Sequence, residues 1–308
     1  VSIRLRLLNW FLNTFEKPKL AAAKTPDDLR KSFELKARFL FPAPRKTRFS
    51  HDVLQSGIGS VNAQWAKSKS ASDDRVILYF HGGGYVFGSP KTHRAMLARL
   101  SAMTGLSACL PDYRLAPEHP FPAAIEDAVL SYKCLLERAI EPQNIILGGD
   151  SAGGGLVLAL LAEIKAQSLP KPAGVFALSP LVDLSFSGLS FSKNAQTDVM
   201  LPASRAADMA TLYLDGADAD DPRASPLQAD FSGMPPVFLT ASDSEILLDD
   251  CLRMADHLRA QGVVVTDRIV ENHPHVWHIF QRLLPEADQG LRAIAAWIKP
   301  LLSGSNES

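Results

Sequence analysis

Short apolar runs alternate along the chain with longer stretches in which apolar residues recur at helical spacing. Apolar runs, which are typical of strands covered on both faces of a sheet, stand at residues 76–80 and 145–147 and, with one polar residue in each, at residues 175–179 and 237–241. Longer segments predict helices at residues 91–104, 121–138, 202–214, 247–261 and 285–302. The apolar run at 156–162, which follows a tight turn, predicts a buried helix. Strands that alternate with helices predict an α/β fold with a mainly parallel sheet.

Weaker signals add strands to this sheet. Residues 47–65 predict two strands, the second with alternation through Val61, Ala63 and Trp65. Residues 107–110 and 263–270 predict two more. The expected sheet therefore has about eight strands.

Residues 1–45 have a helical pattern without strand signals. Apolar residues recur at helical spacing at Leu5, Leu8, Phe11, Leu12 and Phe15. A second helix is expected to begin after Thr25, because Pro26 and two aspartates follow this N-cap residue, and to end before Pro42. The pattern suits either core packing or a cap over a site.

Composition and charge limit the class of protein. The 308 residues are 46% hydrophobic, which allows a substantial core, and 32 Lys and Arg balance 33 Asp and Glu. The nearly balanced charge does not favour binding to nucleic acid or to an anionic membrane. The apolar stretches are too short for stable membrane insertion. Asn9 and Asn13 interrupt the apolar N-terminus, and a small-residue cleavage site is missing, so no signal peptide is expected.

The three cysteines point to a reducing compartment. They are odd in number and widely spaced, at Cys109, Cys134 and Cys251. This usage disfavours a disulfide framework or a zinc site. A cytoplasmic location is expected.

The turn between the run at 145–147 and the helix at 156–162 carries the main candidate for chemistry. Gly149-Asp150-Ser151-Ala152-Gly153 fits Gly-x-Ser-x-Gly. In a strand–turn–helix context this motif holds the serine in a strained conformation above the sheet, and side chains at the two glycines would collide with neighbouring elements. The alternative is a Gly-rich turn with an incidental serine.

Candidate partners for Ser151 follow later strands. Three histidines follow the strand at 263–270: His273, His275 and His278. We choose His275 as the base, because His273 precedes Pro274 and His278 lies one helical turn further on. A metal site formed by the three histidines is the alternative, but no matching carboxylate motif accompanies them. The order of nucleophile, acid and histidine is the one expected for an α/β-hydrolase.

Four carboxylates follow the strand at 237–241: Asp243, Glu245, Asp249 and Asp250. Asp249 and Asp250 are expected to lie in the next helix, where acidic residues are common near the N-terminus. Residue chemistry alone leaves Asp243 and Glu245 open as the triad acid.

Consecutive glycines also follow the strand at 76–80. After His81, the backbone N–H groups of Gly82, Gly83 and Gly84 can approach a substrate closely and form an oxyanion hole with the N–H of Ala152. The competing interpretation is a phosphate-binding loop, but no Gly-Lys-Ser/Thr follows.

Three motifs resemble the bacterial hormone-sensitive-lipase family of α/β-hydrolase esterases. They are His-Gly-Gly-Gly, Asp-Tyr-Arg-Leu-Ala-Pro-Glu-His-Pro-Phe-Pro-Ala-Ala and Gly-Asp-Ser-Ala-Gly-Gly. The resemblance implies Ser151 as nucleophile, His275 as base, and Gly83, Gly84 and Ala152 as oxyanion donors. The family usually shows Asp-Pro-Leu-x-Asp at its acid, whereas this chain has Glu245 at the first position, as a branch of the family does. The alignment thus favours Glu245 over Asp243.

The resemblance also implies a domain organisation and a function. Residues 1–45 would form a helical cap, residues 46–308 the catalytic domain, and residues 183–230 an insertion that contributes to the cap. The expected function is a serine carboxylesterase for short- to medium-chain acyl esters, without cofactor or metal. A non-catalytic binding protein on this scaffold, an amidase or a lactonase is the alternative, and a homodimer is left open.

The expected cap would enclose an apolar pocket. Eight residues are available to line it: Phe11, Phe15, Phe33, Phe39, Phe186, Phe191, Met209 and Leu212.

Overall fold

Eight strands form one sheet at the centre of the computed structural model, which describes residues 2–303. The strands are β1 (Arg48–Ser56), β2 (Gly59–Lys67), β3 (Ser72–Phe80), β4 (Leu106–Pro111), β5 (Ile145–Asp150), β6 (Gly174–Leu178), β7 (Val237–Ser242) and β8 (Val265–Val270). They are ordered β1-β2-β4-β3-β5-β6-β7-β8, and β2 runs in the opposite direction to the other seven. The predicted mainly parallel sheet is confirmed.

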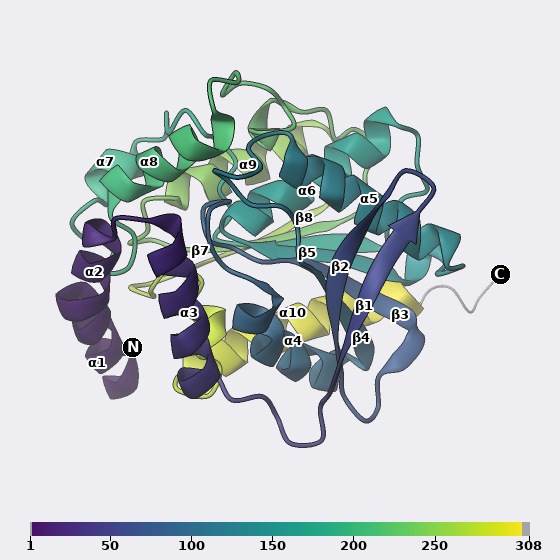
Figure 1. Ribbon diagram of the computed structural model, residues 1–308, viewed down its shortest axis with the longest axis horizontal. Helices are drawn as coiled ribbons and strands as arrows, with labels where there is room; N and C mark the ends of the chain where they lie inside the picture. The colour runs from purple at the N-terminus through teal and green to yellow at the C-terminus, as the bar shows by residue number, and fades with distance from the viewer. Residues whose placement is uncertain (1, 304–308) are drawn as a thin grey trace.

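Helices cover both faces of this sheet, as predicted. Those that follow β1 in the chain are α4 (Pro90–Thr104), α5 (Ala123–Glu137), α6 (Ala152–Ala166), α7 (Ser190–Lys193), α8 (Ala203–Leu214), α9 (Leu248–Ala260) and α10 (Pro285–Ser303). Short 3₁₀ turns lie at η2 (Pro142–Asn144), η3 (Pro226–Gln228) and η4 (Trp277–Phe280). Figure 1 shows α4 and α10 on one side of the sheet and α5, α6 and α9 on the other.

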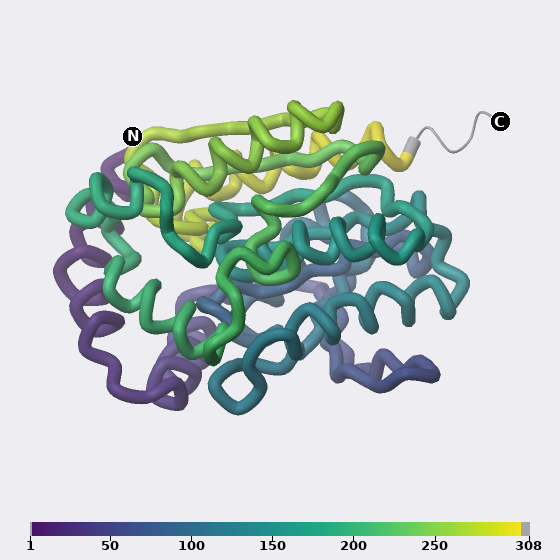
Figure 2. Tube along the Cα trace, turned by 90° about the horizontal axis from the view of Figure 1, so that it is seen from above, coloured from purple at the N-terminus to yellow at the C-terminus, as the bar shows by residue number. Residues whose placement is uncertain are grey.

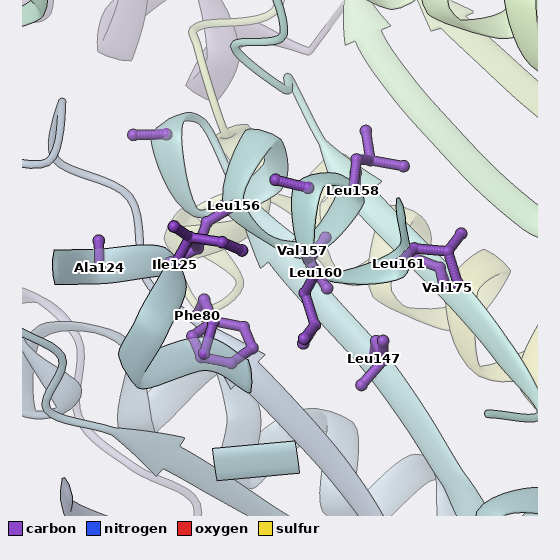
Figure 3. Close-up of a cluster of buried hydrophobic side chains, with 14 of the residues drawn as sticks. Phe80, Ala124, Ile125, Leu147, Leu156, Val157, Leu158, Leu160, Leu161 and Val175 are labelled. Carbon is purple, nitrogen blue, oxygen red and sulfur yellow. The ribbon is translucent and has the colours of Figure 1, made fainter. Parts of the chain in front are cut away.

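The apolar strand runs supply the core between these layers. Ile77 and Tyr79 of β3 point to the α4–α10 side, whereas Val76, Leu78 and Phe80 point to the α5–α6 side, because successive side chains alternate across a strand. Figure 3 shows Phe80 and Leu147 beneath the leucines of α6. The buried α6 thus fixes the turn that precedes it.

The N-terminal residues fold as helices at one end of the sheet, as their periodicity predicts. They comprise α1 (Ile3–Phe11), a π-helical turn η1 (Leu12–Glu16), α2 (Lys17–Ala22) and α3 (Pro26–Leu40). The predicted N-cap is confirmed, since Thr25 Oγ1 accepts a hydrogen bond from Asp28 N at 3.2 Å. Figures 1 and 2 place these purple helices beside α7 and α8.

Two details of the secondary structure differ from the prediction. Strand β3 begins four residues before the apolar run, at Ser72, because Ser72 pairs with Leu106 of β4 ahead of a register shift. The one-turn helix α7 has no periodicity of its own. It depends on tertiary contacts, in which Ser190 N donates to Asp249 Oδ2 at 2.9 Å and Ser190 Oγ donates to Ile246 O at 2.8 Å.

Candidate active site

Ser151 occupies the tight turn between β5 and α6. Its backbone has φ 52° and ψ −123°, a sparsely populated conformation for a residue with a side chain. A Cβ at Gly149 would lie 2.1 Å from Gly153 O, and a Cβ at Gly153 would lie 2.1 Å from Phe80 O. The predicted strain and the predicted collisions at both glycines are therefore confirmed.

His275 and Glu245 come together from the loops after β8 and β7. Glu245 Oε2 lies 2.6 Å from His275 Nδ1, and both side chains are almost completely buried. The second oxygen, Glu245 Oε1, accepts hydrogen bonds from Ser179 Oγ at 2.9 Å and from Ser242 N at 2.8 Å. Both carboxylate oxygens are thus held in place, and Glu245 contacts the imidazole at Nδ1.

The other three candidate acids have different partners. Asp243 Oδ1 accepts a hydrogen bond from Asn272 N at 2.8 Å, so this carboxylate shapes the loop before the histidines. Asp249 bonds to Ser190 N, and Asp250 accepts N–H groups of Val182 and Asp183. The geometry accordingly places Glu245, and not Asp243, beside His275.

The surroundings of His275 favour its protonated form. Burial opposes a charge on the imidazole, but the charge and hydrogen bond of Glu245, with weaker contributions from Asp198 and Asp150, raise the pKa of His275 above its ordinary value of 6.5. This is the electrostatic environment that a base needs in order to stabilise the imidazolium formed when it accepts a proton.

Ser151 and His275 line the same cavity, which has a volume of about 640 Å³. His275 Nε2 is buried and has no hydrogen-bond partner in the part of the chain that the structure describes. The ring nitrogen opposite Glu245 is thus available to a group at the serine. The three residues chosen from the sequence are brought to one site.

The glycine loop after β3 lines this cavity next to Ser151. Gly82, Gly83 and Gly84 all contribute to the wall. Within residues 2–303, the N–H groups of Gly83, Gly84 and Ala152 donate to no protein acceptor. They are suitable donors for an oxyanion.

His81 stabilises the loop by packing. Its ring stacks on Tyr113 at 4.4 Å between centroids, and Tyr113 Oη donates to His81 O at 2.7 Å. Burial, together with the charge of neighbouring His93, lowers the pKa of His81 to about 3. A histidine that stays neutral serves the shape of the loop, as the resemblance implied, and the Tyr113 segment braces it.

The two remaining histidines take separate positions. His278 is buried against Trp277, and burial with the nearby His273 lowers the pKa of His278 to about 3. His273 Nδ1 lies 2.7 Å from Glu271 O. Over the described residues, no group of three or more His, Cys, Asp or Glu side chains is arranged to hold a metal ion.

Apolar side chains from the N-terminal helices, the 181–210 segment and residues 276–283 form most of the cavity wall. Four of the eight residues named from the sequence line it: Phe11, Phe33, Phe186 and Met209. The prediction was wrong for the other four. Phe15, Phe39 and Leu212 are exposed on outer helix faces, and Phe191 stacks behind Phe186 at 4.3 Å between centroids.

Asp198 is a buried residue of the site that sequence reasoning missed. Its Oδ2 accepts from Ile246 N at 3.0 Å and its Oδ1 accepts from Leu201 N at 2.8 Å. Lys17 Nζ donates to the Asp198 carbonyl at 2.6 Å. Asp198 thus joins α2, the α7–α8 segment and the loop of Glu245. No local motif marks it, because Lys17 and Ile246 are distant from it in the sequence.

Comparisons with known proteins agree with this fold. A protein-family model described as an alpha/beta hydrolase fold matches residues 77–279. An acetyl-hydrolase of Streptomyces hygroscopicus is 35% identical over 242 residues, which cover 79% of this chain and 81% of that protein. An esterase of Acinetobacter venetianus is 36% identical over 232 residues, covering 75% and 77% respectively.

Solved structures are similar over nearly the whole chain. The crystal structure of an esterase from the bacterial hormone-sensitive lipase family superposes with a TM-score of 0.92 at 37% identity, covering 98% of this chain and 99% of that one. The structure of EstE5 soaked with p-nitrophenyl butyrate gives a TM-score of 0.91 at 36% identity, covering 98% and 100%. Among the described residues, no helix has the length and apolar character needed to cross a membrane.

Proposed function

The chain belongs to the bacterial hormone-sensitive-lipase family of α/β-hydrolases and is a carboxylic ester hydrolase, and from this premise we propose that it is a serine esterase for short- to medium-chain acyl esters. The observation that carries the proposal is the Glu245–His275 contact of 2.6 Å, with the unpaired His275 Nε2 and Ser151 on the same cavity. A serine hydroxyl is a poor nucleophile without such a base.

In the proposed acylation step, Ser151 Oγ attacks the ester carbonyl while its proton passes to His275 Nε2. Glu245 keeps the Nδ1–H tautomer and stabilises the imidazolium. The N–H groups of Gly83, Gly84 and Ala152 hold the oxyanion of the tetrahedral intermediate. His275 then protonates the leaving alcohol, and the carbonyl re-forms as an acyl–Ser151 ester.

The deacylation step repeats this sequence with water as the nucleophile. Neutral His275 takes a proton from the water, the hydroxide adds to the acyl carbonyl, and the same backbone donors hold the second oxyanion. Collapse of this intermediate returns the proton to Ser151 Oγ and releases the carboxylic acid. Ser151 supplies the nucleophile, His275 the base and the backbone N–H groups the oxyanion donors, so the proposed cycle needs no cofactor.

The proposal includes a cap made of residues 1–45 and part of residues 183–230. Two contacts support it: Lys17 Nζ donates to Ala195 O at 2.8 Å and to Asp198 O at 2.6 Å. Helices α1 and α3 and the segment up to α8 also contribute side chains to the cavity wall beside Ser151. A cap built from both segments would close the acyl pocket.

A binding protein without catalysis is the weaker alternative. Such a protein needs the cavity but has no use for a strained serine, an unpaired imidazole nitrogen and a buried acid in one array. The relatives are named as esterases and acetyl-hydrolases, which favours ester over amide or lactone substrates.

Acyl-chain length tests the substrate class. Each methylene buried in the apolar pocket adds about 0.8 kcal/mol of binding until the chain reaches the closed end. We expect kcat/KM for 4-nitrophenyl esters, measured without detergent, to peak between acetate and about hexanoate. A maximum at palmitate, or a jump in rate when the substrate forms a separate phase, would show a true lipase and contradict the proposal.

The pH dependence tests the role of His275. Only neutral imidazole accepts the Ser151 proton, and the raised pKa of His275 means that the neutral form is lost at a higher pH than for an ordinary histidine. We expect kcat/KM to fall on acidification with a midpoint above 6.5, the ordinary histidine value. A midpoint well below that value would show that Glu245 does not stabilise the imidazolium.

A further inference from the structure

An apolar stripe runs along the outer face of α1 and η1. Its members are Ile3, Leu7, Trp10 and Phe15, which are 76%, 61%, 60% and 43% exposed. They recur at helical spacing, and the π-helical turn brings Phe15 against Trp10 at 5.6 Å between ring centroids. Leu5 and Leu12, on the opposite face, are buried against the body of the protein. The helix therefore packs with one apolar face and exposes another.

Basic residues border this stripe. With 3.6 residues per turn, Arg4 and Arg6 project on either side of the line through Ile3, Leu7 and Trp10. Both arginines are exposed and make no ion pair within the described residues. Exposed apolar side chains flanked on both sides by basic ones are typical of a helix that lies in the plane of a lipid–water interface.

The charges are distributed unevenly along the chain, and the basic excess lies at the N-terminal end that carries the stripe. Residues 1–45 contain ten Lys and Arg but four Asp and Glu, a net charge of +6, whereas residues 46–308 contain 22 and 29, a net charge of −7. The balanced total therefore hides a basic end. Anionic lipid headgroups attract such an end, while the acidic remainder of the protein is repelled.

The stripe is next to the opening of the cavity. Three residues that line the cavity are also exposed to solvent: Phe11 by 41%, Leu40 by 45% and Leu283 by 40%. A side chain that is half in solvent and half in the wall marks where the cavity reaches the surface. Phe11 contacts Phe15 of the stripe at 5.5 Å between centroids, so the stripe and the rim are continuous.

We propose that the outer face of α1 and η1 is a docking surface for an anionic lipid–water interface, and that docking turns the cavity rim at Phe11 toward that surface. The apolar stripe enters the headgroup region, and Arg4 and Arg6 contact anionic headgroups on either side. A second copy of this chain fits less well, because a symmetric contact would set two basic surfaces against each other. Docking does not depend on the proposed reaction.

Vesicle co-sedimentation tests this docking surface. We expect the wild-type chain to partition at least about tenfold more to vesicles of phosphatidylcholine with 30% phosphatidylglycerol than to pure phosphatidylcholine, with a blue shift of tryptophan fluorescence that is lost when Trp10 is replaced. Ile3→Ser/Trp10→Ser and Arg4→Glu/Arg6→Glu should each lose about tenfold or more of this partition. None of these residues lines the cavity, so 4-nitrophenyl butyrate turnover without vesicles should stay unchanged and report correct folding.

Matched variants separate the outcomes. Ile58→Ser/Val264→Ser removes apolar residues of similar exposure, 71% and 67%, outside the stripe and should bind vesicles like the wild type. Ser151→Ala should also bind like the wild type, which keeps docking distinct from the proposed catalysis. Equal partition to both vesicle types, or no effect of either stripe variant, would overturn the proposal. Self-association that Ile3→Ser/Trp10→Ser abolishes, without vesicle binding, would instead assign the stripe to a second copy.

Discussion

Ser151→Ala is expected to fold normally and to lose nearly all hydrolysis of 4-nitrophenyl butyrate. In the proposed mechanism the acyl–enzyme bond is made to Ser151 Oγ and later broken there, so both half-reactions need this atom. Members of such a triad also act as a unit. Losses of up to about 10⁶-fold in kcat follow removal of one member. Alanine has the same Cβ as serine, so the turn at φ 52° gains no new backbone strain, and we expect the melting temperature to change little.

Two measurements make this test specific. An organophosphate should label the wild-type protein once, at Ser151, and should leave Ser151→Ala unlabelled by intact-mass spectrometry. Ser192→Ala, a change at an exposed serine, should retain both labelling and activity. Turnover in Ser151→Ala within about tenfold of the wild type would end the serine-hydrolase proposal, because the oxyanion donors alone cannot supply a nucleophile.

Elements with strong local signals in the sequence are predicted at the correct positions. Three features are found where predicted: the apolar run of β3, the Thr25 N-cap and the Gly149–Gly153 turn. Each has a signal that is local in the sequence, namely an apolar run, a capping residue before a proline, or glycines at fixed spacing. The choice of Glu245 over Asp243 required a resemblance, because both are acidic residues of one loop. The structure separates them by their hydrogen-bond partners, which lie about thirty residues away in the chain.

Features that depend on distant partners could not be predicted. Asp198 is significant only because Lys17 and Ile246, which are far from it in the chain, both bond to it. Phe15 and Phe39 share the helical spacing of pocket residues but face solvent. Periodicity groups the residues of one helix face but does not indicate which face packs against the rest of the protein.

Glu245→Gln is expected to reduce kcat/KM by about 10⁴-fold, as replacement of a triad carboxylate by its amide does elsewhere. The carboxylate oxygen Oε1 accepts from Ser179 Oγ and Ser242 N, so a Gln oxygen takes that place and its NH₂ group faces His275 Nδ1. An NH₂ donor pairs only with an unprotonated Nδ1. The proton then resides on Nε2, and the imidazole cannot accept the proton of Ser151.

Asp243→Asn is the matched control for this change. Asp243 Oδ1 accepts from Asn272 N, and an amide oxygen does so equally well, so activity should fall by less than about threefold. The comparison uses kcat/KM for 4-nitrophenyl butyrate across a pH series. Loss of the Glu245 charge leaves burial as the main influence on the pKa of His275, so the residual activity of Glu245→Gln should persist to lower pH than that of the wild type. If Asp243→Asn is instead the crippling variant, the acid of this triad is Asp243, and the buried Glu245–His275 contact serves only to shape the loop.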